Sequence, residues 1–391
     1  MERNVYLDHA ATTYVRKEVL DEMMPFFTQN FGNPSSVYKL GQENKKAVEL
    51  AKERIAKAIG ATPNEIYFTA GGCEGDNWVI KGIAFANRSK GNHIITTEIE
   101  HPAIINSCKF LEKLGFEVTY LGVDADGKIR LEELKAAIKP NTILISVMFA
   151  NNEIGTIQPI AEIAKLAREN GVYFHTDAVQ AVGNLRINVA ELGVDMLSLS
   201  GHKFYGPKGI GALYIKKGTK IDALIHGGGQ EQGKRAGTEN VPAIVGMGKA
   251  IDLTYQEFDR YNSKVLALRE KLINGIFEKI PYVKLNGHRT DRLPGNVNFS
   301  FKFIEGESLL LMLNMKGVSG SSGSACSSGS LDPSHVLLAI GLDHGTAHGS
   351  LRLTIGEDNT EEDIDYVLEI LPAIVERLRE MSPLKPTKED K

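Results

Sequence analysis

The sequence predicts an α/β protein with a large domain, built on a mainly parallel sheet, and a smaller α+β domain. Between residues 15 and 225, short runs rich in β-branched and aromatic residues alternate with helical patterns. After Gly248 the alternation gives way to a long helical pattern, two strand-like segments and a last helix. A chain of 391 residues is also too long for one simple core. We place the large domain at 15–255 and the small domain at 1–14 and 256–391.

The large domain is expected to contain at least six strands, separated by helices such as the one at 160–170, which Gly171 ends. Strands that alternate with helices run mostly parallel, and ligands bind at their carboxyl ends. The small domain is expected to hold one helix at 251–280, strands at 297–303 and 351–355, and a helix at 360–381. The strands of the large domain are expected at 65–69, 93–97, 142–149, 172–176, 196–200 and 211–215.

The composition argues against several classes of protein. Lys and Arg total 45 against 49 Asp and Glu, so the net charge of −4 gives no reason to expect a nucleic-acid or membrane partner. The first residues lack the pattern of a signal peptide, and no apolar run is long enough for a membrane helix. The three cysteines, Cys73, Cys108 and Cys326, form neither a disulfide framework nor a CxxC metal site. We therefore expect a soluble protein of the reducing cytoplasm.

One segment has an unusual composition. Ten of the twelve residues from Ser319 to Ser330 are Ser or Gly, and Cys326 stands among them. Such a composition is typical of a flexible linker. Linkers seldom carry a thiol, however, and this one leads directly into a helix start near Ser334. A loop that presents a reactive cysteine is the second interpretation.

The strongest chemical signal follows the strand that ends at Ser200. Burial at a strand end favours the neutral amine of Lys203, the form that makes Schiff bases. Ser200 and His202 beside it supply donors suited to a phosphate. A surface loop with a solvated lysine remains the alternative.

Two further positions add to this signal. Asp177, with Gln180 three positions on, ends the strand at 172–176, where an acid can keep a pyridine nitrogen protonated or simply cap a helix. The turn of Gly71, Gly72 and Cys73 opens a helix whose backbone N–H groups suit an anion. Neither GxxxxGK[ST] nor a GxGxxG after a strand occurs, so a nucleotide-binding function loses support.

Eight blocks, in order along the chain, together carry a specific resemblance. They are YLDHAATT (6–13), FGNPSSVY (31–38), EHPAI (100–104), NNEIGTIQP (151–159), HTDAVQAVG (175–183), SGHKFYGPKGIGALYI (200–215), GGGQEQGKRAGTEN (227–240) and GSACSSG (323–329). In these blocks the sequence resembles the cysteine desulfurase family (NifS/IscS-like), in the class V aminotransferase group of fold-type I pyridoxal-phosphate (PLP) enzymes, from about residue 5 to 381. The resemblance implies an aspartate aminotransferase-like fold.

The resemblance also implies a role for each site residue. Lys203 binds PLP covalently, Asp177 pairs with the pyridine nitrogen, Gln180 contacts the phenolic oxygen, and His101 stacks on the ring and moves protons. Cys326 is the nucleophile that takes the sulfur. The remaining roles are phosphate binding by Gly72, Cys73, Ser200, His202 and, from the partner subunit of a homodimer, Thr238, with Arg352 binding the substrate carboxylate and Asn152 contacting cofactor and substrate.

Cys73 departs from the usual pattern of the family, and a pair of histidines has no role in it. The family commonly has a hydroxyl residue where Cys73 stands, and a thiol is the weaker donor to a phosphate. His344 and His348 have the spacing of a helical metal pair but lack the acidic partner of HExxH, so no metal site is expected.

The activity implied by the resemblance is conversion of L-cysteine to L-alanine, with the sulfur held as a persulfide on Cys326. The sulfur then passes to an acceptor protein, such as an iron–sulfur scaffold, or to other thio-cofactors. A selenocysteine lyase, or another class V PLP enzyme, shares the cofactor apparatus but not the thiol. The sequence also leaves open a sulfur-trafficking partner or PLP-binding scaffold without turnover, and an α/β binding protein without PLP.

Overall fold

The computed structural model describes residues 4–322 and 333–383. Its main sheet has seven strands in the order β2-β8-β7-β6-β5-β3-β4. The pairings from β7 through β4 are parallel, whereas β8 runs antiparallel to both β7 and β2, so the predicted mainly parallel sheet is confirmed. The strands are β2 (Ile66–Thr69), β3 (His93–Thr97), β4 (Glu117–Leu121), β5 (Thr142–Ser146), β6 (Tyr173–Asp177), β7 (Met196–Ser200) and β8 (Gly211–Ile215).

Helices cover both faces of this sheet. On one face α4 (Gly72–Ala86) and α5 (Pro102–Glu112) bury Trp78 and Cys108 against apolar strand residues. A larger core on the other face involves α3 (Lys39–Ile59) and α7 (Ile160–Glu169). The shorter helices of this part are α1 (Lys17–Met23), α2 (Pro25–Thr28), α6 (Leu131–Ala137) and α8 (Val189–Leu192).

The single helix predicted at 251–280 is wrong. The chain forms two helices, α9 (Val241–Gln256) and α10 (Phe258–Lys279), which meet at Glu257. Asn240 caps the first of them, and the helix continues through Gly248. The two helices serve different cores, since α9 packs on α3 of the large part and α10 packs on α14 (Glu361–Met381).

The small domain has its own core. A three-stranded antiparallel sheet packs with α10, α11 (Gly306–Met315) and α14, and β1 (Val5–Tyr6) pairs with β11 (Val318–Ser319). Two short helices lie between these elements in sequence, α12 (His335–Ala339) and α13 (His344–His348). Although the sequence assigns this stretch to the small domain, Val336 and Leu337 belong to the large core. The three-stranded sheet consists of β12 (Ser350–Thr354), β10 (Asn296–Phe301) and β9 (Val283–Leu285) in that order.

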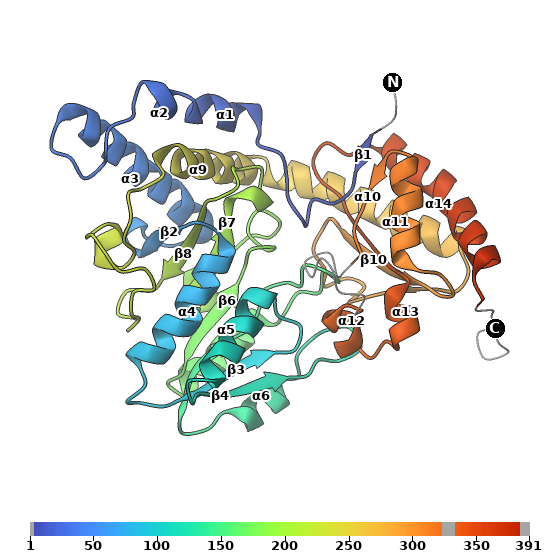
Figure 1. The fold of residues 1–391 in the computed structure, drawn as a ribbon, viewed down its shortest axis with the longest axis horizontal. Helices are drawn as coiled ribbons and strands as arrows, with labels where there is room; N and C mark the ends of the chain where they lie inside the picture. Colours follow the sequence, from blue (N-terminus) through green and yellow to red (C-terminus); the bar gives the residue numbers. More distant parts are fainter. Residues whose placement is uncertain (1–3, 323–332, 384–391) are drawn as a thin grey trace.

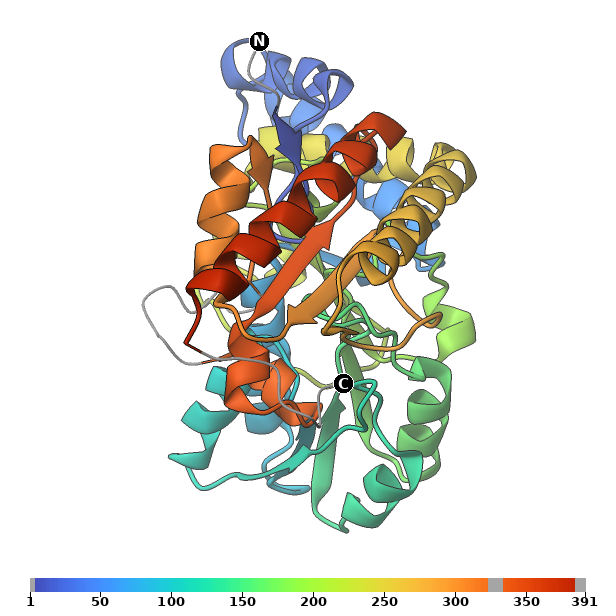
Figure 2. The same cartoon turned by 90° about the vertical axis from the view of Figure 1, so that its right-hand side faces the viewer.

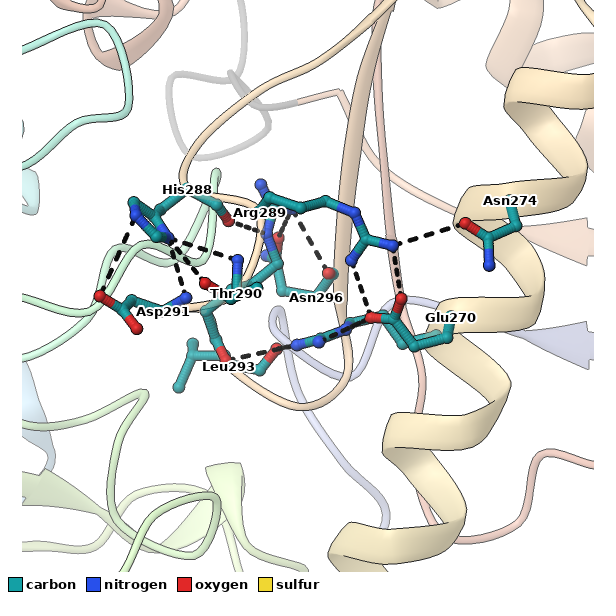
Figure 3. A network of polar contacts seen from close by, with 10 residues as sticks. Glu270, Asn274, His288, Arg289, Thr290, Asp291, Leu293 and Asn296 are labelled. Atoms are coloured by element: carbon teal, nitrogen blue, oxygen red, sulfur yellow. Dashed lines mark hydrogen bonds and ion pairs between the residues drawn. The ribbon is translucent and has the colours of Figure 1, made fainter.

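The two parts lie side by side and are joined at several points (Figures 1 and 2). The loop between β9 and β10 reaches the large part, where the Leu293 amide donates to the Gly155 carbonyl at 2.9 Å. The same loop is held to α10, because its Arg289 binds the Glu270 carboxylate of the helix and Arg269 of the helix donates to the Leu293 carbonyl of the loop (Figure 3). This loop therefore links the large sheet to the small domain. Among the described residues, no helix is long and apolar enough to cross a lipid bilayer.

Candidate active site

Lys203 ends a single helical turn directly after β7. Its Nζ donates to the Ala10 and Ala11 carbonyls at 2.5 and 2.8 Å. Gln180 Nε2 donates to the same Ala10 carbonyl at 2.9 Å. The amino-terminal segment therefore runs against the predicted cofactor residues, although it is almost two hundred positions away from Lys203 in the sequence.

Asp177 is the last residue of β6 and is 7% exposed. One carboxylate oxygen accepts a hydrogen bond from the Val179 amide at 2.9 Å. Burial raises the pKa of this carboxyl, and the charges of His101 and Lys203 oppose the rise. The structure thus brings three residues from separate motifs within electrostatic reach of one another.

His101 is the N-cap of α5. Its Nδ1 accepts a hydrogen bond from the Ala103 amide at 3.1 Å, so the neutral ring carries its proton on Nε2. Burial lowers the pKa of the imidazole, while the nearby Asp177 raises it. A neutral His101 can accept a proton only at Nδ1, after the contact of this atom with the Ala103 amide is broken, whereas its Nε2–H can already donate a hydrogen bond.

The turn before α4 has the features of a phosphate site. Gly71 offers no side chain to cap this helix of fifteen residues, so among the described residues its first amides are left without a side-chain acceptor. A Cβ on Gly72 would lie 2.5 Å from Val179 Cγ2, so only glycine fits there. A Cβ on Gly71 would lie 3.9 Å from Ser200 Oγ, which places this hydroxyl beside the turn.

Two other predicted phosphate contacts differ in character. His202 Nδ1 lies 3.1 Å from Thr12 Oγ1, and burial lowers the pKa of this imidazole to about 4, so the ring is neutral near pH 7. The Cys73 thiol is exposed, and its Sγ lies 3.7 Å from Asn77 Nδ2. Partial burial raises the pKa of Cys73, so a smaller fraction of this thiol is ionised near neutral pH.

The loop at 227–240 lies beside the same turn. Arg235 binds the Glu74 carboxylate of α4 with its Nε at 2.9 Å. Thr238, three residues further on, is exposed in the single chain. Its predicted contact with a neighbour's phosphate stays a prediction.

Arg352 comes from β12 of the small domain and is 3% exposed. Its Nη2 donates to Asp8 Oδ1 at 2.8 Å and its Nη1 to the backbone carbonyl of Asn152 at 3.0 Å. Its Nε is buried and has no acceptor in the part of the chain that the structure describes. Arg352 and Asn152, both predicted at the substrate, are therefore in contact, although through the backbone of Asn152.

Cys326 lies outside the described residues. Described residues on either side of it contact Arg352, which is predicted at the substrate, and Glu153, the neighbour of Asn152. Ser321 pairs with the backbone of Arg352, and Ser334 Oγ donates to Glu153 Oε2 at 2.5 Å.

Several carboxylates close to the predicted site residues were not identified from the sequence. Asp8, Glu100 and Glu153 all lie inside the quoted blocks, and Glu100 and Glu153 are direct neighbours of His101 and Asn152, which were identified. Asp76 lies in the second turn of α4, 1% exposed, and its Oδ1 accepts no hydrogen bond from the described residues. A carboxylate next to a predicted site residue was the signal that could have found Glu100 and Glu153.

The sequence of this chain also matches a known protein family. Residues 5–367 match the family described as Aminotransferase class-V. The chain belongs to the class-V aminotransferase family. This finding confirms the predicted fold class and the predicted cofactor, since the enzymes of this family depend on PLP.

Curated relatives and solved structures agree with the family. The protein named cysteine desulfurase IscS from Clostridium botulinum (strain Hall) is 63% identical over 98% of this chain and 97% of its own. Its namesake from Methanosarcina thermophila is 61% identical over 98% of this chain and 94% of its own. A solved NifS-like protein superposes with a TM-score of 0.91 at 38% identity, over 96% of this chain and 100% of its own. The resemblance to NifS/IscS-like cysteine desulfurases is thereby confirmed.

One prediction concerns Glu100, the fully buried neighbour of His101. Its Oε1 accepts from Thr97 Oγ1 at 2.7 Å and from the Met148 amide at 2.9 Å, and burial raises its pKa to about 8. The Glu100 carboxyl has a pKa near 4.5 in the unfolded chain and about 8 in the folded chain. The folded protein therefore loses stability as the pH rises between these two values.

Glu100→Gln should therefore lose less stability than the wild type between pH 6 and 8. The difference should reach about 2 kcal/mol, measured by urea unfolding of the holoenzyme at both values. Glu98→Gln is the matched control, since Glu98 is exposed two residues away. Equal losses in wild type and Glu100→Gln would contradict this assignment.

Proposed function

We propose that this protein is a PLP-dependent cysteine desulfurase that converts L-cysteine to L-alanine and holds the sulfur as a persulfide on Cys326. The observation that carries the proposal is the grouping of Lys203, Asp177 and His101 in one site. Relatives named cysteine desulfurase, 63% identical over nearly the whole chain, support the substrate. A solved relative described as SspA in complex with cysteine, 40% identical with a TM-score of 0.81, covering 91% of this chain and all of that one, supports it further.

The residues present fit PLP. The uncapped start of α4 and Ser200 suit its phosphate, and the buried carboxylate of Asp177 suits a protonated pyridine nitrogen. Lys203 Nζ, which the Ala10 and Ala11 carbonyls orient, is the amine that holds the cofactor covalently. Bound there, PLP supplies an electron sink for the bonds of an amino acid's α-carbon.

The reaction assigns one task to each residue. Arg352 orients the substrate carboxylate, and Lys203 Nζ, once released, takes the α-proton. The Cys326 thiolate attacks the substrate sulfur, so an S–S bond forms while the C–S bond breaks and leaves its electron pair on the carbon skeleton. That skeleton takes up one proton at the carbon that carried the sulfur, regains one at the α-carbon, and leaves as alanine. We assign the first of these proton movements to His101 and the second to Lys203.

The competing assignment is a lyase of the same family that eliminates without a thiol nucleophile. Purified protein incubated with L-cysteine and a thiol reductant should release sulfide and alanine in equal amounts. Release of sulfide with pyruvate in place of alanine would contradict the proposal. Absence of both products would revive a scaffold without turnover.

The persulfide must pass to an acceptor, for which we propose an iron–sulfur scaffold protein or another thio-cofactor system. The name IscS of the relatives supports a role in supplying sulfur. Cys326 acts only as a free thiol, which the reducing cytoplasm maintains, so we assign the protein to that compartment.

We also propose a homodimer in which Thr238 completes the phosphate site of the neighbour. The support is twofold: the loop at 227–240 lies beside the phosphate turn, and large apolar side chains are exposed along residues 24–38, including Phe31 at 69% and Val37 at 93%. Sedimentation of dilute holoenzyme should show a dimer, and Phe31→Glu should weaken it. An active monomer would rule out the shared site.

A further inference from the structure

Glu153 is a buried carboxylate for which the mechanism above has no task. It stands in the loop after β5, next to Asn152, and is 5% exposed. Its Oε2 accepts a hydrogen bond from Ser334 Oγ at 2.5 Å. Ser334 is the N-cap of α12, and its hydroxyl in turn accepts from the Val336 and Leu337 amides. The Glu153 carboxylate thus fixes the start of α12 to the loop that carries Asn152.

The backbone of Glu153 is held just as firmly. Its carbonyl accepts from Asn296 Nδ2 at 3.1 Å and from Asn298 Nδ2 at 3.0 Å, two buried side chains of β10. Asn296 is itself held by Arg292 Nη1 at 3.2 Å, within the polar network next to α10 (Figure 3). Side chains of the small domain therefore fix the position of Glu153 in the loop of the large one.

Arg352 lies on the other side of the same loop. It donates to the carbonyl of Asn152, the residue before Glu153, and to Asp8, which leaves the buried Nε without an acceptor among the described residues. Burial raises the pKa of Glu153 to about 7, and the hydrogen bond from Ser334 and the charge of Arg352 oppose the rise. Arg352 and Glu153 thus interact electrostatically across a loop that both domains hold.

We propose that Glu153 is a positioning residue for the carboxylate of the amino-acid substrate. By tying the loop at 151–155 to α12 and β10, it holds the Asn152 carbonyl where it fixes the Arg352 guanidinium. It thereby keeps Arg352 Nε, which has no acceptor among the described residues, available to a ligand carboxylate. Glu153 touches neither substrate nor cofactor in this assignment. The inference rests on the proposed function for the identity of the substrate, but only on the contacts above for the role of Glu153.

The test compares Glu153→Ala, Glu153→Gln and Ser334→Ala as holoenzymes. Glu153→Ala should raise the KM for L-cysteine about tenfold or more and change kcat much less. The lost contact positions Arg352, which binds the substrate carboxylate, and does not position the reacting groups. Glu153→Gln keeps an acceptor for Ser334 and should stay within about threefold of wild type. Ser334→Ala should follow Glu153→Ala, and it replaces that variant if the latter does not fold. Glu162→Ala, an exposed glutamate of α7, is the matched control.

Two readouts separate this role from a general loss of structure and from a wrong substrate. Cofactor content and its visible band should stay unchanged, and the dissociation constant of L-alanine, titrated by that band without turnover, should rise with the same pattern as KM. If wild type does not turn over L-cysteine, the proposed function fails, whereas the L-alanine titration still tests Glu153. Unchanged L-alanine affinity in both Glu153→Ala and Ser334→Ala, or equal losses of cofactor and ligand binding, would overturn the inference.

Discussion

Lys203→Ala is expected to abolish covalent attachment of the cofactor and to reduce L-cysteine turnover by about a thousandfold or more. The reason is that, in the proposed mechanism, Lys203 Nζ is both the amine that binds PLP and the base that takes the substrate's α-proton. The wild-type protein should be yellow, and borohydride reduction followed by peptide mapping should find the pyridoxyl label on the peptide containing Lys203.

Lys208→Ala is the matched control for this experiment. Lys208 follows in the same glycine-rich stretch, is exposed, and donates to the Thr13 carbonyl of the amino-terminal segment at 3.4 Å. This variant should keep the label and the colour. A label on any lysine other than Lys203 would show that the cofactor site has been assigned wrongly.

Cys326→Ser is expected to reduce sulfide and alanine production together to background, while cofactor binding survives. A serine hydroxyl does not ionise near neutral pH, whereas a thiol of pKa about 8.5 does so readily. Addition of L-cysteine should still change the visible spectrum, because Lys203, Asp177 and Arg352 are intact.

The two remaining thiols provide the controls for Cys326→Ser. Cys108 is a fully buried residue of α5, and burial raises its pKa to about 12, so it has no access to substrate. Cys73 lies at the phosphate turn, and its pKa is also raised. Cys73→Ser should keep desulfuration and restores the hydroxyl that the family commonly has there. Sulfide release by Cys326→Ser at a rate near wild type would instead favour the lyase.

The sequence predicts much of this fold because the signals are local. The strands at 93–97, 196–200 and 211–215 are found with the predicted bounds, since each is a short apolar run between turn residues. The break at Glu257 was missed because apolar spacing stays helical on both sides of it. Only tertiary packing, which directs α9 and α10 to different cores, separates the two helices.

The grouping of the predicted site residues could be anticipated for a similar reason. Some of their neighbours were missed for a different reason. Lys203 and Gly72 follow strands and Asp177 ends one, and at these strand ends the fold brings ligand-binding residues together. The roles of Asp8 and Glu153 depend on contacts with Arg352 and Ser334, which lie far away in the sequence. No spacing rule relates such partners, so the structure was needed to find them.

The central claim is that sulfur leaves L-cysteine as a persulfide on Cys326. Mass spectrometry of peptides from holoenzyme treated with a stoichiometric amount of L-cysteine, without reductant, tests it directly. We expect the peptide containing Cys326 to gain the mass of one sulfur atom, the gain to disappear on reduction, and alanine to form in equal amount. Alanine formation with the added sulfur on Cys73, or with no added sulfur on any cysteine, would contradict the claim.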